Sequence, residues 1–217
     1  MKEIDNSLKS GTRVKLKQIK RALQLIVDCI STDESYLLGF TVERNVEDYY
    51  AFHAVNVAIL SVILGRRIGL DRQNLRILAI SALFHDIGKI EIPSGILSKK
   101  ADFSPKELEL IKRHPIDGIK ILLKAFGLSE TLILSMLVSY EHHMKANFSG
   151  YPEVRDTRKL NPFSQIVSIA DDYDSLISGR DYERRKLGRE DALRFIAQGS
   201  GTLYDPLLLK AFTGIFA

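Results

Sequence analysis

A chain of 217 residues with 45% hydrophobic side chains is long enough to bury a substantial core, so it does not need a disulfide framework to fold. The net charge of +4 is mild, and lysines and arginines alternate with acids, which indicates a solvated surface rather than a site for a DNA or RNA polymer. The start, "MKEIDNSLKSGTRVKLKQIK", has no secretory apolar core, and the longest apolar runs are too short to span a bilayer. We therefore expect a cytoplasmic protein without membrane insertion.

The first predicted helix rests on an apolar stripe between residues 16 and 30. Its members recur at helical spacing and are Leu16, Ile19, Leu23, Ile26, Val27 and Ile30. The single cysteine, Cys29, stands among these apolar residues. We interpret it as a small core residue in a reducing compartment rather than half of a disulfide.

Further helices follow in chain order, with ends placed to within about 2–4 residues. Ser104, Pro105 and Glu107 supply a capping serine, a proline at the first helical position and a glutamate at the third, which predicts a helix over 105–115. The other predicted helices span 48–68, 71–87, 116–126, 129–143, 162–178, 189–198 and 205–216. No run alternates with period two for long enough to predict a sheet, so the expected fold is an all-α bundle.

One domain over residues 1–217 is the simplest organisation, with an N-terminal helical lead-in over 1–45 and the core over 46–217. Two irregular stretches, 87–103 and 144–163, are longer than the usual helix connection. Long connections of this kind are often functional.

Candidate metal ligands recur at regular intervals. Intervals of 28 residues separate Asp86 from His114, His114 from His142, and His143 from Asp171. In a helical bundle, such spacing lets successive helices each return a ligand to one level. The predicted ligand set is His53, His85, Asp86, His114, His142, His143 and Asp171.

Imidazole and carboxylate groups suit iron, manganese or zinc, and seven of them suit two ions rather than one. Two ions about 3.5–4 Å apart would hold a hydroxide in line with a phosphorus atom. Asp86 is the expected carboxylate between the ions, and Lys89 a point charge for a phosphate oxygen.

Each histidine taken alone is more often a hydrogen-bonded core or surface residue, and for His53 or His114 that is the favoured interpretation. The adjacent pairs change the balance, because burying His142 and His143 together is costly unless something binds them. Asp171 follows the apolar run "IVSIA", which favours a ligand facing the core, and Asp172 is left as a surface residue.

The sequence resembles the HD-domain metal-dependent phosphohydrolases, and specifically their bacterial HD-GYP branch. The likeness runs from about residue 45 to 212, through "FHAVNVAILSVILG", "ALFHDIGKIEIPSGIL", "IKRHPIDGIKIL", "YEHH", "GYP", "IVSIADDYDSLISGRDY" and "GSGTLYDP". The resemblance implies a helical domain with a buried site for two or three metal ions, often iron or manganese, that hydrolyses cyclic di-GMP. It also implies that the seven residues above are the ligands, that Lys89 and Arg180 contact phosphate, and that Tyr151 is the tyrosine of the named loop.

The chain departs from the family pattern at several positions. Tyr49 stands where members with three metals carry a glutamate, so we expect two metals. After the paired histidines, Met144, Asn147 and Phe148 replace a glutamate, an aspartate and a glycine. Phe148 is the most disruptive, because a backbone position that tolerates positive φ would be lost and the loop would have to rearrange. Glu183 also replaces a common basic residue.

Three functions remain open on the sequence. The first is a phosphodiesterase with two metals acting on cyclic di-GMP or a related nucleotide. The second is a weakly active or inactive module that keeps the metals and docks partners such as diguanylate cyclase domains through Met144 and Phe148, if these are exposed. The third is a di-iron oxygenase, which Lys89 and Arg180 disfavour because they suit a phosphate.

Overall fold

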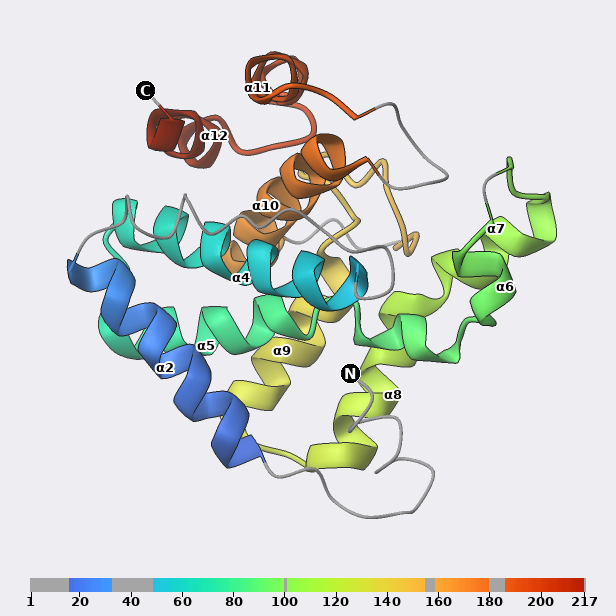
Figure 1. Cartoon of the computed structure of the whole chain (residues 1–217), viewed down its shortest axis with the longest axis horizontal. Helices are drawn as coiled ribbons and strands as arrows, with labels where there is room; N and C mark the ends of the chain where they lie inside the picture. Colours follow the sequence, from blue (N-terminus) through green and yellow to red (C-terminus); the bar gives the residue numbers. More distant parts are fainter. Residues whose placement is uncertain (1–15, 33–48, 100, 155–158, 180–185, 217) are drawn as a thin grey trace.

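The computed structural model describes residues 16–32, 49–99, 101–154, 159–179 and 186–216, and all of the regular structure in these ranges is helical (Figure 1). An isolated bridge between Ser200 and Tyr204 is the sole β-type pairing within them. The predicted all-α architecture is confirmed.

Helix α4 (Tyr49–Arg67) lies at the centre of the bundle. From Asn56 to Gly65 every residue is buried, because α4 packs against α5 (Arg72–Leu83) on one side and α10 (Pro162–Ser178) on another. A helix that is covered on all sides must be apolar on all sides, as "VAILSVILG" is. Helix α2 (Leu16–Thr32) packs across α4 and α5 (Figure 1).

Helix α5 ends at Leu83, short of the predicted end at residue 87. The chain turns at Phe84 and continues as a short 3-10 helix, η2 (Ile87–Glu91). The turn is needed because η2 packs closely on α8 (His114–Phe126): a Cβ at Gly88 would lie 1.9 Å from the backbone oxygen of His114. The predicted irregular stretch 87–103 thus contains η2 and the short helix α6 (Ser94–Leu97).

The remaining helices follow the sequence prediction closely. They are α7 (Pro105–Lys112), α9 (Glu130–Glu141), α11 (Arg189–Ala197) and α12 (Pro206–Thr213), followed by the 3-10 helix η3 (Gly214–Phe216). The capping box at the start of α7 is confirmed, since Ser104 and Glu107 each accept a hydrogen bond from the other's backbone N–H.

The main core lies between α4, α5, α9 and α10 and includes Leu60, Ile63, Leu78 and Ile169. The interpretation of Cys29 as a core residue is wrong, because its side chain is exposed. Val27 and Ile30 occupy the buried face of α2, and Cys29 lies between them in sequence but on another face. None of the helices described is long and apolar enough to cross a membrane.

Candidate metal centre

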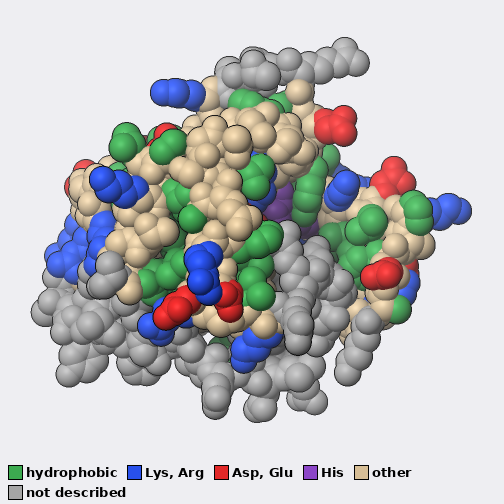
Figure 2. All heavy atoms as spheres, turned by 90° about the horizontal axis from the view of Figure 1, so that it is seen from above, with side chains coloured by type: hydrophobic (Ala, Val, Ile, Leu, Met, Phe, Trp, Pro, Cys, Tyr) green, Lys and Arg blue, Asp and Glu red, His purple; other side chains and the backbone are tan. Residues whose placement is uncertain are grey.

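The seven predicted ligands come from five segments of the chain and meet in one buried cluster. His53 lies on α4, His85 and Asp86 follow α5, His114 begins α8, His142 and His143 follow α9, and Asp171 lies on α10. All seven are buried except His143, whose side chain is 11% exposed. Histidine is visible at the bottom of a recess in the molecular surface (Figure 2).

Asp86 stands at the centre of the cluster, and its two oxygens face different histidines. Its Oδ1 lies 3.2 Å from Nε2 of His114 and 3.7 Å from Nε2 of His142. Its Oδ2 lies 3.5 Å from Nε2 of His53 and 3.4 Å from Nε2 of His85. One carboxylate therefore joins two groups of imidazoles.

Helix ends orient three of the imidazoles. The Nδ1 of His85 donates to the carbonyl of Ala82 at 2.7 Å, and the Nδ1 of His114 donates to that of Ile111 at 2.7 Å. His142 likewise donates from Nδ1 to Ser139, at 2.9 Å.

Carbonyl groups in the last turn of a helix lack partners further along it, so they are available to accept these bonds. The three Nε2 atoms are thereby turned into the cluster.

Asp174 belongs to the site and was not predicted. It is fully buried, and its Oδ2 accepts a hydrogen bond from Nδ1 of His53 at 2.6 Å, while Asn56 donates to its Oδ1 at 3.0 Å. The Nε2 of His53 consequently faces Asp171, at 3.1 Å. A sequence signal was present, since Asp171 and Asp174 are three residues apart and so lie on one face of α10.

The cluster fits divalent metal ions. Three sets of ligand atoms each lie within 4.8 Å of one another, namely Asp86, His114, His142 and His143; His53, His85 and Asp86; and His85, His142 and Asp171. The Nε2 atoms of His85 and His143 are buried without a hydrogen-bond partner among the described residues.

The Nε2 atoms of His114 and His142 face each other at 3.3 Å. Because both rings donate from Nδ1, both facing Nε2 atoms carry lone pairs in the neutral tautomer. A cation bound between them would remove the repulsion of these lone pairs.

The pKa values of the clustered histidines are shifted in opposite directions. Burial lowers the pKa of His114 to about 4, and it lowers the pKa of His142 and, further, of His143. Burial also opposes protonation of His53, but hydrogen bonds to Asp171, Asp174 and Asp86 outweigh it and raise the His53 pKa well above the usual value.

Asp86 is held as a carboxylate. Burial alone would raise its pKa, but the nearby charges of Lys89 and His85 outweigh burial and lower that pKa well below the usual range. The centre of the cluster therefore holds an ionised carboxylate, which can serve as a metal ligand.

The residues predicted to bind the substrate lie in different surroundings. Lys89 is buried, forms an ion pair with Oδ2 of Asp86 and lies 6.0 Å from the centre of the Tyr50 ring. Tyr151 stacks on His143, with ring centres 4.6 Å apart. Arg180 and Glu183 lie outside the described residues, as does the side chain of Tyr49.

The loop after His143 does not meet the condition set for Met144, and it keeps a backbone conformation that was expected to be lost. Met144 is buried, so it cannot supply an exposed docking surface. Phe148 keeps a positive φ of 59°, so the backbone position expected to need glycine retains its conformation with a phenylalanine. Asn147 accepts a hydrogen bond from the Ser149 N–H at 3.1 Å, which forms a local turn.

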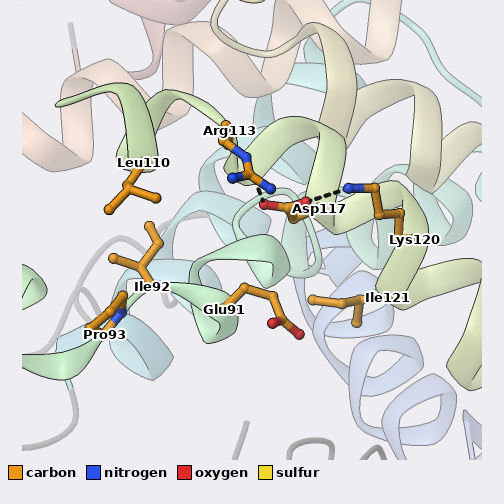
Figure 3. Close-up of a pocket in the computed structure, with 8 residues that line it drawn as sticks. All are labelled: Glu91, Ile92, Pro93, Leu110, Arg113, Asp117, Lys120 and Ile121. Carbon is orange, nitrogen blue, oxygen red and sulfur yellow. Dashed lines mark hydrogen bonds and ion pairs between the residues drawn. The ribbon is translucent and has the colours of Figure 1, made fainter. Parts of the chain in front are cut away.

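A separate pocket of about 380 Å³ lies between η2, the end of α7 and α8 (Figure 3). Apolar side chains line it together with Glu91, Arg113, Asp117 and Lys120. Asp117 pairs with both Arg113 and Lys120, its neighbours in sequence (Figure 3). None of the lining residues belongs to the metal cluster.

The chain is similar in sequence to a known protein family and to several characterised proteins. A model of the HD domain matches residues 39–208. A cyclic di-GMP phosphodiesterase of Thermotoga maritima is 34% identical over 160 residues, which are 74% of this chain and 43% of that protein. A second cyclic di-GMP phosphodiesterase, from Pseudomonas aeruginosa, is 28% identical over 176 residues, 81% of this chain and 41% of that protein. The chain thus spans about two fifths of the length of these relatives.

Among solved structures, a HDG"Y"P protein from Bdellovibrio bacteriovorus superposes with a TM-score of 0.73 at 22% identity. The match covers 91% of this chain and 62% of that one. At this level of identity the likeness establishes the fold.

Proposed function

Because the chain belongs to the HD-domain family, in its HD-GYP branch, we propose that it is a metal-dependent phosphodiesterase that hydrolyses cyclic di-GMP. The observation that carries the proposal is the position of Asp86. Its two oxygens lie within 3.7 Å of Nε2 atoms from four histidines, two histidines on each oxygen. A carboxylate in this position can be shared by two ions.

The proposed ligands form two groups that share Asp86. His53 and His85, with Asp171 beside them, would hold one ion, and His114, His142 and His143 would hold the other. Two divalent ions, iron or manganese, would supply Lewis acidity toward a phosphodiester and an activated water. Asp174 would keep the His53 ring in the orientation that presents Nε2.

The residues of the chain would also bind and orient the substrate. Lys89 is a buried cation beside Asp86 and would neutralise charge on a phosphate oxygen. Tyr151 stacks on His143 and offers a ring at the edge of the site. The proposed phosphate contact of Arg180 belongs to the same scheme.

The alternative is a module that holds metals and nucleotide but turns over slowly, docking partners such as diguanylate cyclase domains. Its support is the altered loop, with Asn147 exposed and Phe148 half-buried. The burial of Met144 removes one of the two apolar contacts on which this alternative depended. We therefore favour the enzyme.

The test is hydrolysis by purified protein loaded anaerobically with Fe(II) or Mn(II). Cyclic di-GMP should be converted to the linear dinucleotide or GMP, as followed by chromatography, and Asp86→Ala should abolish conversion. Asp117→Asn, in the separate pocket, should retain the wild-type rate. If the loaded wild-type protein binds cyclic di-GMP and releases no product, the module replaces the enzyme.

A further inference from the structure

Lys145 joins the loop after His143 to helix α10. Its ammonium forms an ion pair with Oδ2 of Asp172 and lies 3.3 Å from the hydroxyl of Ser168. The side chains of Lys145 and Asp172 are only 16% and 22% exposed, so solvent screens the pair less than it screens a surface pair. Asp172, predicted to be a surface residue, is therefore half-buried in a contact between two segments.

Tyr204 completes this contact from a third segment. Its hydroxyl donates to the same Oδ2 of Asp172 at 2.6 Å, and Lys145 Nζ lies 5.5 Å from the centre of its ring. The turn before α12 fixes Tyr204, since its N–H donates to Gly199 at 3.1 Å and its carbonyl accepts from Gly201 at 3.0 Å. We call Lys145, Asp172 and Tyr204 the lysine cluster.

The loop that carries Lys145 is closed on itself. The N–H of Tyr151 donates to the His143 carbonyl at 3.1 Å, and the N–H of Gly150 donates to that of Met144 at 3.1 Å. Beside the lysine cluster, the N–H of Ala146 donates to the Leu203 carbonyl at 2.9 Å. Movement of Lys145 would therefore be passed to the start of the loop.

The start of the loop is His143, two residues before Lys145, and Asp171 directly precedes Asp172. The Nδ1 of His143 lies 3.8 Å from Oδ2 of Asp171. The lysine cluster and this His143–Asp171 approach thus join the same two segments at adjacent points. Two such contacts restrict both separation and rotation of the loop relative to α10.

Lys145 also has a φ of 63°, a left-handed backbone conformation that is disfavoured for residues other than glycine. Such strain persists where the surrounding structure over-determines the backbone, and it often marks a constrained site. The ion pair, the cation–aromatic contact and the hydrogen bond at Ala146 are contacts that constrain the backbone at Lys145.

We propose that Lys145, Asp172 and Tyr204 are positioning residues that fix His143 against Asp171. The inference deepens the proposed function and rests on it, because it concerns two of the proposed metal ligands. Lys145 and Asp172 act through their neighbours in sequence, and Tyr204 acts through Asp172.

Asp117 provides a matched comparison within the same chain. It too is a largely buried carboxylate, 14% exposed and paired with a lysine, and it lies three residues from another proposed ligand, His114. Its partners Arg113 and Lys120 flank it in the same stretch of chain, so its pairs do not join separate segments. Loss of its charge should leave the relative positions of the ligand segments unchanged.

The experiment compares Asp172→Asn and Tyr204→Phe with Asp117→Asn. Equilibrium dialysis with Mn(II) measures the affinity of each metal equivalent, and NMR of the imidazole groups in metal-free protein measures the surroundings of His143 and His53. We expect Asp172→Asn to weaken one of two Mn(II) equivalents by about 10–100-fold. It should shift the His143 signals more than those of His53, whose ring Asp174 also holds. Tyr204→Phe should give a smaller change in the same direction, and Asp117→Asn none.

Lys145→Arg tests for a specific role of the cation and should retain wild-type behaviour better than Lys145→Met. If Asp172→Asn does not fold, Tyr204→Phe decides, because it removes a single hydroxyl. Unchanged Mn(II) affinity and unmoved His143 signals in the folded variants would overturn the inference.

Failure of the proposed function is a separate result. Wild-type protein that binds Mn(II) without hydrolysing cyclic di-GMP would remove the enzyme proposal while leaving the dialysis and NMR comparison valid. If wild-type protein binds no Mn(II), the His143 signals of metal-free protein alone decide for or against positioning.

Discussion

Asp174 accepts a hydrogen bond from Nδ1 of His53 at 2.6 Å, with both side chains fully buried. This contact fixes the ring so that Nε2 is presented to Asp86 and Asp171. A buried carboxylate behind a proposed ligand is a common means of orienting a metal-binding imidazole.

Replacing Asp174 should therefore weaken metal binding without removing a ligand. Asp174→Asn keeps the shape of the side chain but loses the charge, and we expect the affinity for one metal equivalent to fall about 10–100-fold. Mn(II) dialysis measures this, with the exposed Asp191→Asn as the control. Equal affinities in the two variants would show that Asp174 does not support His53.

Helix η2 packs so closely on α8 that any side chain added at Gly88 should destabilise the fold. A Cβ there would lie 1.9 Å from the His114 oxygen and 2.6 Å from the Gly118 nitrogen, both backbone atoms. Gly88→Ala must separate η2 from α8, so we expect a loss of at least about 1–3 kcal/mol in the free energy of unfolding. Urea denaturation measures the loss. The control is Gly95→Ala, where nothing lies within 4 Å and stability should hold or rise.

The positive φ of Phe148 can be tested by two truncations. Phe148→Gly and Phe148→Ala remove the same ring, but alanine keeps a Cβ that disfavours a φ of 59°. We expect the glycine variant to be more stable than the alanine variant by about 1 kcal/mol. The urea midpoints of the two proteins give the comparison. An alanine variant as stable as the glycine variant would contradict a left-handed backbone at this position.

Metal should stabilise the fold, because Nε2 of His85 and Nε2 of His143 are buried and find no hydrogen-bond partner in the described part of the chain. At a free metal concentration 100 times the dissociation constant, the gain is about 2.7 kcal/mol per site. Thermal unfolding of wild-type protein should shift upward on adding Mn(II) and return on chelation. Asp86→Ala should melt at the same temperature in both conditions, and an equal shift in that variant would place the binding elsewhere.

The sequence predicted the helices and the convergence of the seven residues well, for identifiable physical reasons. Helical periodicity marks buried faces, and a capping box such as that of Ser104 and Glu107 marks a helix start. The regular spacing of His114 and His142 predicted that they lie at one level on successive helices. Their roles as ligands stay predictions, as does the division of the chain into lead-in and core.

The failures arose where tertiary contacts decide the outcome. Cys29 has apolar neighbours in sequence, but the direction of its side chain follows from the angle around α2, which leaves it exposed. Met144 was a docking contact only on the condition that it is exposed, and tertiary packing buries it. Asp172 was assigned to the surface because acidic positions on a helix are usually solvated, but Lys145, which is distant in sequence, covers part of it.

Metal analysis of anaerobically purified protein tests whether the site holds two ions. We expect about two equivalents of iron or manganese per chain in the wild type, and a marked loss of both in Asp86→Ala, because the two proposed ligand groups share that carboxylate. One equivalent or less in the wild type, or wild-type metal content in Asp86→Ala, would contradict this expectation.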